Sequence, residues 1–239
     1  TLCNLACTNC YIESTPSNDR LEYIRLSEVK QYLDEIERDN IATDEIGLTG
    51  GEPFMNPNMI DMARISMQRG YSVLILTNAM RPMMRPRIQA GLLDLKKAYG
   101  NALTLRVSVD HFKQNLHEEE RGADSWAPMI KGLKWLSTNK FQIDIAGRTR
   151  WGESEAELRE GFAALFKRQK IAIDAQKAAA DSQFDIKEKY LNQYNTLDAQ
   201  EKLMGGLMDD QQKAHLKYNK ALFKAAEAYE SGATQAQAN

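Results

Sequence analysis

Short apolar runs alternate with amphipathic helical patterns through residues 1–169, and this alternation restricts the fold more than any other feature of the chain. The runs expected to form strands are 45–49, 72–76, 103–109 and 141–146. Helical spacing of apolar residues predicts a helix capped by Ser27, one starting near Pro57, one after Pro86, and two over 125–137 and 153–166. Strands that alternate with helices of this length indicate βαβ units, so we expect an α/β domain with a parallel sheet.

The composition changes near residue 169, which suggests a boundary in the chain. After Arg168 there is no Arg, Val, Pro, Trp or Cys, while Ala and Gln become frequent. Apolar residues at helical spacing between Tyr190 and Phe223 indicate two or three helices there. We therefore expect an α/β domain over 1–169 and a helical extension with a disordered tail over 170–239.

Charge and cysteine content exclude several classes of protein. The 239 residues carry a formal net charge of −2, which gives no electrostatic footprint for nucleic acid. No apolar run approaches the roughly 20 residues that cross a bilayer, and no signal peptide is visible. Three cysteines cannot all pair within one chain, so we expect a reducing compartment and a cytoplasmic location.

All three cysteines lie at the start of the chain, as Cys3, Cys7 and Cys10 in a C-x3-C-x2-C pattern. Thiolates are soft ligands suited to zinc or to iron–sulfur clusters. Structural zinc usually takes four protein ligands, but there is no second cysteine pair and the three histidines are distant in sequence. Three close cysteines fit a four-iron cluster that leaves one iron open to a small molecule; an incidental zinc site is the weaker alternative.

With Tyr11 directly after Cys10, this pattern resembles the signature of the radical S-adenosylmethionine (SAM) enzymes. Gly50-Gly51-Glu52-Pro53 follows the 45–49 strand and is similar to the GGEP motif of that family. Ser108-Val109-Asp110 at a later strand end, and the segment 117–122 after it, are also typical of the family. The resemblance covers about residues 1–169.

The resemblance implies a fold and a reaction. The three thiolates would hold a [4Fe-4S] cluster whose open iron chelates SAM. An electron from a donor such as flavodoxin or ferredoxin would cleave SAM to a 5′-deoxyadenosyl radical, which abstracts hydrogen from an unidentified substrate. The family fold is a partial (β/α) barrel. Here it is expected to be incomplete, because only Thr1-Leu2 precede Cys3 and the sixth strand has a weak candidate at 171–174.

The resemblance also implies ligand roles for residues at the strand ends, each with a plainer alternative. Tyr11 would lie beside the cluster and adenine, and the expected roles of the others concern SAM. The backbone carbonyls of Gly50 and Gly51 and the Glu52 carboxylate would meet its ammonium group, with Pro53 as the last cofactor-binding residue of the motif. Ser108 and Asp110 would reach its ribose or carboxylate, and Arg148 its carboxylate. Asn78, which with Thr77 ends the 72–76 strand on the same face, is a further candidate. The alternatives are turn formation at Gly50-Gly51 and Thr77-Asn78, capping by Ser108 and Asp110, and a surface ion pair at Arg148.

Other polar and methionine residues are expected to have structural roles. We expect His111 and His117 in a solvated or structural loop, residues 118–120 in a solvated stretch, and the methionines of 59–84 in packing. As an alternative to the enzyme, the composition break and short first strand allow a non-catalytic helical interaction or structural protein that carries a truncated or misjoined radical SAM fragment.

Overall fold

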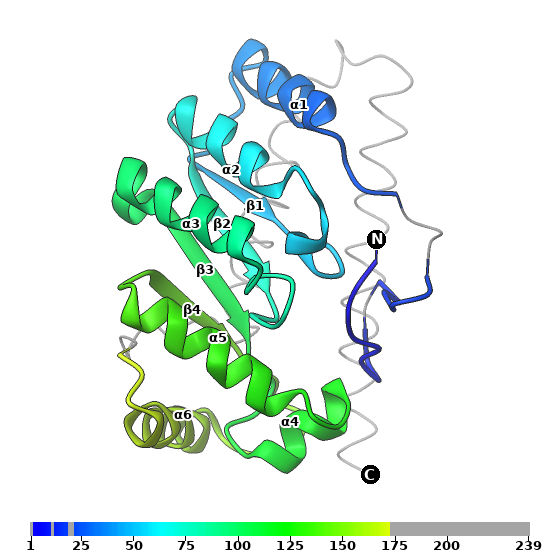
Figure 1. The fold of residues 1–239 in the computed structure, drawn as a ribbon, viewed down its shortest axis with the longest axis vertical. Coiled ribbons are helices and arrows are strands. Elements are labelled where there is room, and N and C mark those ends of the chain that lie inside the picture. The colour runs from blue at the N-terminus through cyan, green and yellow to red at the C-terminus, as the bar shows by residue number, and fades with distance from the viewer. Residues whose placement is uncertain (1, 11, 19–21, 173–239) are drawn as a thin grey trace, which may run out of the picture. The chain divides into compact units, whose positions relative to one another are not determined.

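A computed structural model of the chain describes residues 2–10, 12–18 and 22–172 (Figure 1). Its centre is a sheet of four parallel strands in the order β1-β2-β3-β4. The strands are β1 (Glu45–Leu48), β2 (Ser72–Thr77), β3 (Leu103–Ser108) and β4 (Gln142–Ala146). The expected α/β class and parallel sheet are confirmed, and each strand lies where its apolar run predicts it.

Helices connect successive strands, and Figure 1 shows α2, α3 and α5 in front of the sheet. The α-helices are α1 (Leu26–Arg38), α2 (Met59–Gln68), α3 (Pro86–Tyr99), α4 (Gln114–Arg121), α5 (Trp126–Thr138) and α6 (Glu155–Gln169). Two short 3-10 helices are η1 (Pro53–Met55) and η2 (Gly100–Ala102). The predicted helical extension lies outside the described residues from residue 173 onward, as does the second half of the strand candidate at 171–174.

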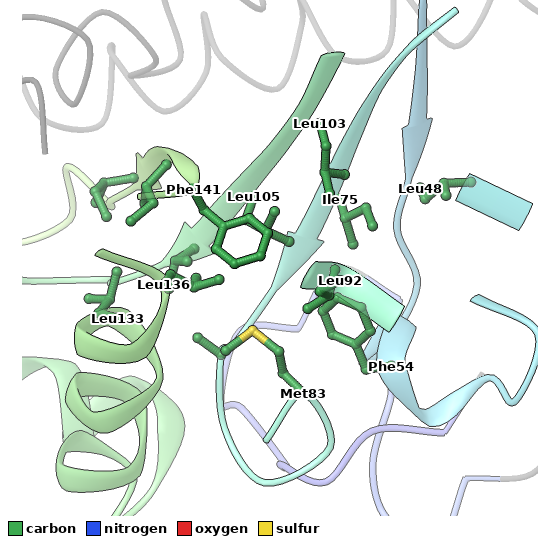
Figure 2. Close-up of a cluster of buried hydrophobic side chains, with 14 of the residues drawn as sticks. Leu48, Phe54, Ile75, Met83, Leu92, Leu103, Leu105, Leu133, Leu136 and Phe141 are labelled. Carbon is green, nitrogen blue, oxygen red and sulfur yellow. The ribbon is translucent and has the colours of Figure 1, made fainter. Parts of the chain in front are cut away.

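The hydrophobic core lies between the sheet and this helical layer (Figure 2). Ile75 of β2 and Leu105 of β3 are fully buried, as are Leu92 of α3 and Leu133 of α5. Each such side chain contributes about 1.5–3 kcal/mol relative to an exposed position, so the core holds the strand ends in fixed places. The packing role expected for the methionines is confirmed, because five are buried and one packs against the core: Met59, Met62, Met67, Met80, Met83 and Met84.

The expected cap of the first helix was wrong, and the reason is local. α1 begins at Leu26, so Ser27 lies within its first turn and Arg25 occupies the N-cap position. The backbone N–H of Arg25 donates to the Glu28 carboxylate at 2.7 Å, so the acidic residue at the third helical position satisfies the N–H of the N-cap residue, as it does in a capping box. In α6 the cap is conventional: Ser154 Oγ accepts from the backbone N–H of Glu157.

Helix α4 is the element that the sequence patterns did not predict. It contains His117 and Glu120, which were expected in a loop and a solvated stretch, yet both are fully buried. These two side chains form the buried face of α4 where apolar residues normally lie, so the helical period of apolar residues is missing from the sequence. Among the described residues, no helix is long and apolar enough to cross a membrane.

Candidate functional site

The cysteine loop, residues 2–10, packs directly against the turn that follows β1. A Cβ atom added to Gly51 would lie 2.5 Å from the Leu2 carbonyl oxygen and 3.0 Å from Cys3 Cβ. The backbone N–H of Glu52 donates to the same Leu2 oxygen at 3.3 Å. Gly51 is therefore needed for close approach of the chain to itself, and this contact places Cys3 at the carboxyl end of β1.

Glu52 ties this turn to the end of β2. Its side chain is fully buried and accepts hydrogen bonds from the backbone N–H groups of Phe54 (3.2 Å) and Asn78 (2.9 Å) and from the Thr77 hydroxyl (2.9 Å). Burial raises the pKa of Glu52 to about 7, although the three hydrogen bonds act in the opposite direction. Phe54 belongs to the turn itself, and Thr77 and Asn78 lie at the end of β2, so the Glu52 carboxylate fixes the GGEP turn against that strand end.

Asn78 extends this link to the cysteine loop. Its side-chain amide donates to Asn4 Oδ1 at 2.9 Å, and the side-chain amide of Asn4 contacts Met80 Sδ at 3.9 Å. Asn4 follows Cys3 directly. The end of β2 therefore fixes the same stretch of loop that Gly51 contacts.

The three thiols lie in one short segment with graded burial: Cys3 is buried, while Cys7 and Cys10 are partly exposed. Burial raises the pKa of Cys3 to about 11 and raises that of Cys7, whereas the Arg121 guanidinium lowers both. The Cys10 sulfur accepts from the backbone N–H of Ser14 at 3.3 Å. With their pKa values raised, Cys3 and Cys7 keep their protons at neutral pH unless a metal centre supplies positive charge.

The donor set consists of three thiols within one short segment. Thiolates are soft ligands of the kind that hold iron–sulfur clusters, so the chemistry of these residues fits such a group. Within the described parts of the chain, no three His, Cys, Asp or Glu side chains come close enough together to hold one metal ion.

A second set of polar side chains lies where β3 ends. Asp110 is 2 % exposed and accepts from Arg121 Nε at 2.7 Å and Nη2 at 3.0 Å. Arg148, which follows β4, approaches the same carboxylate at 3.3 Å, and its backbone N–H donates to the Asp110 carbonyl at 2.9 Å. Burial would raise the pKa of Asp110, but Arg121 and Arg148 outweigh it and hold that pKa below its ordinary value.

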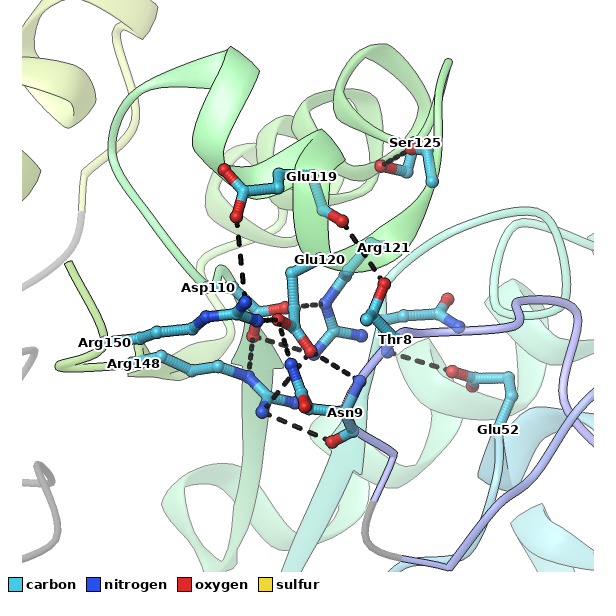
Figure 3. A network of polar contacts seen from close by, with 12 residues as sticks. Thr8, Asn9, Glu52, Asp110, Glu119, Glu120, Arg121, Ser125, Arg148 and Arg150 are labelled. Atoms are coloured by element: carbon cyan, nitrogen blue, oxygen red, sulfur yellow. Dashed lines mark hydrogen bonds and ion pairs between the residues drawn. The ribbon is translucent and has the colours of Figure 1, made fainter. Parts of the chain in front are cut away.

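Glu120 joins this set to the cysteine loop (Figure 3). Its carboxylate accepts from the Asn9 backbone N–H at 2.9 Å and from the Asn9 side-chain amide at 3.0 Å. Arg150 Nη1 lies 2.5 Å from Glu120 Oε2, and Arg148 Nη1 lies 3.5 Å from Oε1. Arg148 also donates to the Asn9 carbonyl at 3.3 Å. We call Asn9, Glu120, Arg148 and Arg150 the Glu120 clasp.

Sequence reasoning missed Glu120. The available signal was charge: an acidic run over 118–120 and two arginines at 148 and 150 both follow predicted strand ends, and parallel strands bring such ends to one edge of the sheet.

The structure brings most, but not all, of the expected site residues into contact. Gly51 and Glu52 meet the cysteine loop, Asn78 meets Asn4, and Asp110 meets Arg148. Ser108 ends β3 opposite Ala146, and Tyr11 lies outside the described residues. His111 lies in the loop between β3 and α4, and its role there is structural, as one of the two expected alternatives: it is buried, with Nε2 2.9 Å from the Glu153 carboxylate and Nδ1 accepting from the Lys113 N–H.

Comparison with protein families and curated proteins gives consistent matches. The model of the Radical SAM superfamily matches residues 1–148. The chain is 30% identical over 145 residues to the antilisterial bacteriocin subtilosin biosynthesis protein AlbA of Bacillus subtilis, covering 60% of this chain and 30% of that protein. It is 32% identical over 144 residues to the AdoMet-dependent heme synthase of Methanosarcina barkeri, covering 60% of this chain and 38% of that one. The chain thus spans about a third of the length of these relatives.

Solved structures show the same fold. Streptococcus suis SuiB matches with a TM-score of 0.55 and 17% identity, over 72% of this chain and 36% of SuiB. SuiB bound to S-adenosylmethionine matches with a TM-score of 0.54, over 82% of this chain and 44% of SuiB. At this level of identity the likeness concerns the arrangement of strands and helices.

Proposed function

Since the chain belongs to the radical SAM superfamily, whose members bind a [4Fe-4S] cluster and SAM, we propose that Cys3, Cys7 and Cys10 hold that cluster here. When bound, the cluster and SAM supply the 5′-deoxyadenosyl radical that abstracts hydrogen from a substrate. The observation that carries the proposal is the attachment of the cysteine loop on two sides. Gly51 and Glu52 contact it near Cys3, and Glu120 holds it between Cys7 and Cys10.

We propose that the backbone at Gly50 and Gly51 accepts hydrogen bonds from the SAM ammonium group. This assignment is supported by the position of Gly51, whose added Cβ would touch Cys3. Glu52 does not take part directly in this proposal, because its carboxylate already accepts three protein hydrogen bonds. Its role is to hold the turn, with Pro53 and Phe54 buried behind it.

We propose different roles for the residues at the strand ends. Asp110 orients Arg121 and Arg148, because both guanidiniums already contact its carboxylate. The Arg148 side chain is 32% exposed, which leaves part of it available to a SAM carboxylate. Ser108, at the end of β3, remains a candidate for the ribose, whereas the Asn78 amide already bonds Asn4 and the Met80 N–H and is proposed to hold the loop. Tyr11, next to Cys10, remains the candidate neighbour of the cluster.

The proposed substrate is a peptide. AlbA is named for the biosynthesis of a bacteriocin, and SuiB has been solved bound to its precursor peptide SuiA. We further propose residues 1–169 as the catalytic domain and 170–239 as an extension. A reducing cytoplasm would keep the thiols reduced, and a flavodoxin or ferredoxin would deliver the electron.

The test is anaerobic reconstitution of the full chain with iron and sulfide. We expect about four iron atoms per chain, and formation of 5′-deoxyadenosine when dithionite and SAM are added. Cys7→Ala removes one of three ligands and is expected to abolish both. A wild-type chain that binds zinc in preference to iron, or that loads iron equally well as Cys7→Ala, would refute the proposal.

A further inference from the structure

We propose that Glu120 is a positioning residue for the cysteine loop, and that it sets the placement of the Cys7 and Cys10 thiols by holding Asn9 between them. The inference rests on the proposed function, because it concerns the group that those thiols would hold. Glu120 itself is not proposed to contact that group.

The contacts between α4 and the loop are concentrated between the second and third cysteines. Glu120 uses both carboxylate oxygens on Asn9, one for the backbone N–H at 2.9 Å and one for the side-chain amide at 3.0 Å. Its own backbone carbonyl accepts the N–H of Thr8 at 3.0 Å. Two successive loop residues are therefore bonded to one residue of α4, which fixes both the position and the orientation of this short segment (Figure 3).

The carboxylate is held in place from the opposite side by two arginines. Glu120 is fully buried, and a buried carboxylate is stable only when it is paired and hydrogen-bonded. Arg150 and Arg148, both beyond the end of β4, provide that pairing. Arg148 also contacts the Asn9 carbonyl and Asp110, so the clasp joins the loop to the ends of β3 and β4.

The neighbouring residue Glu119 provides a matched comparison. Its side chain is 50% exposed and lies 3.8 Å from Arg150, and only its backbone carbonyl faces Thr8. Replacing the Glu119 side chain removes a similar charge from the same turn of α4 but leaves Asn9 bonded. If Glu120 positions the loop, substitution of Glu120 should impair retention of the cluster far more than substitution of the adjacent Glu119.

The mechanism proposed for Glu120 is preorganisation. A loop without the Asn9–Glu120 bonds samples other conformations. The conformational entropy lost when the loop becomes ordered around the cluster then weakens cluster binding. In Glu120→Ala, the N–H and amide of Asn9 lose their acceptor. In Asn9→Ala only the side-chain bond is lost, so its effect should be smaller. The double variant should resemble Glu120→Ala, because both substitutions remove one shared interaction.

The experiment uses the full chain after anaerobic reconstitution with iron and sulfide. Loss of the visible absorbance of the cluster in the presence of an iron chelator gives a half-life, and the EPR spectrum of the dithionite-reduced protein reports the cluster environment. We expect Glu120→Ala to lose its cluster about tenfold faster than the wild type, the factor that corresponds to about 1.4 kcal/mol. Glu119→Ala should keep the wild-type half-life and spectrum.

Two conservative variants separate position from charge. Glu120→Gln keeps an oxygen at the same reach for the Asn9 N–H but loses the acceptor of the Asn9 amide and of Arg150. Glu120→Asp keeps the charge but moves the carboxylate away from Asn9 by the length of one methylene. The proposal predicts that the Asp variant loses the cluster faster than the Gln variant. If the Asp variant equals the wild type and the Gln variant equals Glu120→Ala, charge rather than placement matters and the proposal is overturned.

The remaining outcomes distinguish this inference from the proposed function. If the wild type takes up no iron, both fail. If the wild type takes up about four iron atoms and Glu120→Ala behaves as Glu119→Ala, only the role of Glu120 fails. If thermal unfolding shows that Glu120→Ala does not fold, Asn9→Ala replaces it, since Asn9 lies outside every helix and strand. A wild-type half-life in Asn9→Ala would then overturn the proposal.

Discussion

Substituting Gly51 by alanine tests the packing of the cysteine loop with a single added carbon. The φ angle of Gly51 is outside the positive range that excludes side chains, so the backbone itself tolerates alanine there. The added Cβ, however, would lie 2.5 Å from the Leu2 carbonyl oxygen and 2.8 Å from its carbon. The effect of Gly51→Ala therefore comes from contact with the loop alone.

The cost follows from these distances. The Leu2 carbonyl has to move by about 1 Å to restore ordinary contact, and overpacking of this kind costs about 1–3 kcal/mol. The same movement breaks the hydrogen bond from the Glu52 N–H to Leu2, which is worth about 1 kcal/mol. A combined penalty of about 3 kcal/mol shifts the docking equilibrium of the loop by roughly a hundredfold.

Reactivity of the Cys3 thiol measures this shift without any metal. In a chain with Cys7→Ala and Cys10→Ala, Cys3 is the single thiol and is 6 % exposed, so it should react slowly with a disulfide reagent. Gly51→Ala should react much faster. Gly47→Ala is the matched control, because an added Cβ there meets nothing within 4 Å. If Cys3 reacts at the same rate in Gly51→Ala and Gly47→Ala, the reasoning is refuted.

Three further predictions concern stability. Gly132→Ala should lower Tm by roughly 6–12 °C in thermal unfolding, because its Cβ would collide with the Ala79 carbonyl and cost about 3 kcal/mol; an unchanged Tm would contradict this packing. Burial lowers the pKa of His117 to about 4, and its ring nitrogens have no hydrogen-bond partner among the described residues. Stability should fall as pH drops below about 6.5, and His117→Phe, packed on Trp126, should recover about 2 kcal/mol at pH 5 in urea unfolding. The raised pKa of Glu52 has the opposite effect on the pH dependence of stability: the free energy of unfolding falls as pH rises from about 4.5 through about 7. Glu52→Gln should remove that loss, which amounts to at most about 3 kcal/mol. If the free energy of unfolding in urea depends on pH equally in Glu52→Gln and in the wild type, the pKa of Glu52 is not raised.

The strands could be predicted because buried parallel strands are nearly continuous apolar runs. The run at 72–76 became β2 (Ser72–Thr77), and the run at 103–109 became β3 (Leu103–Ser108). Helix α4 could not be predicted in the same way, because its buried residues His117 and Glu120 are polar. Their burial depends on partners supplied by other segments, which local periodicity does not contain.

The candidate site could likewise be predicted only in part. The cysteine spacing and the GGEP turn could be identified by residue type and order. The partners of those residues could not, because Glu120 lies 111 positions after Asn9, and Thr77 lies 25 positions after Glu52. Arg148 was expected either to pair with a SAM carboxylate or to form a surface ion pair, and its bonds to Asp110 and to the Asn9 carbonyl could not be predicted from the local sequence.

The sequence separation within the Glu120 clasp also has a consequence for synthesis of the chain. The Arg148–Asn9 contact spans 139 positions, so the loop that carries the thiols is translated long before the residues that hold it. At 5–20 residues per second, the ribosome needs roughly 7–28 s to complete that span. During this interval the nascent thiols lack their final partners and are open to oxidation or to premature metal capture. Insertion of the cluster into a correctly arranged loop is therefore expected to follow translation of Arg150 rather than accompany synthesis of the cysteines.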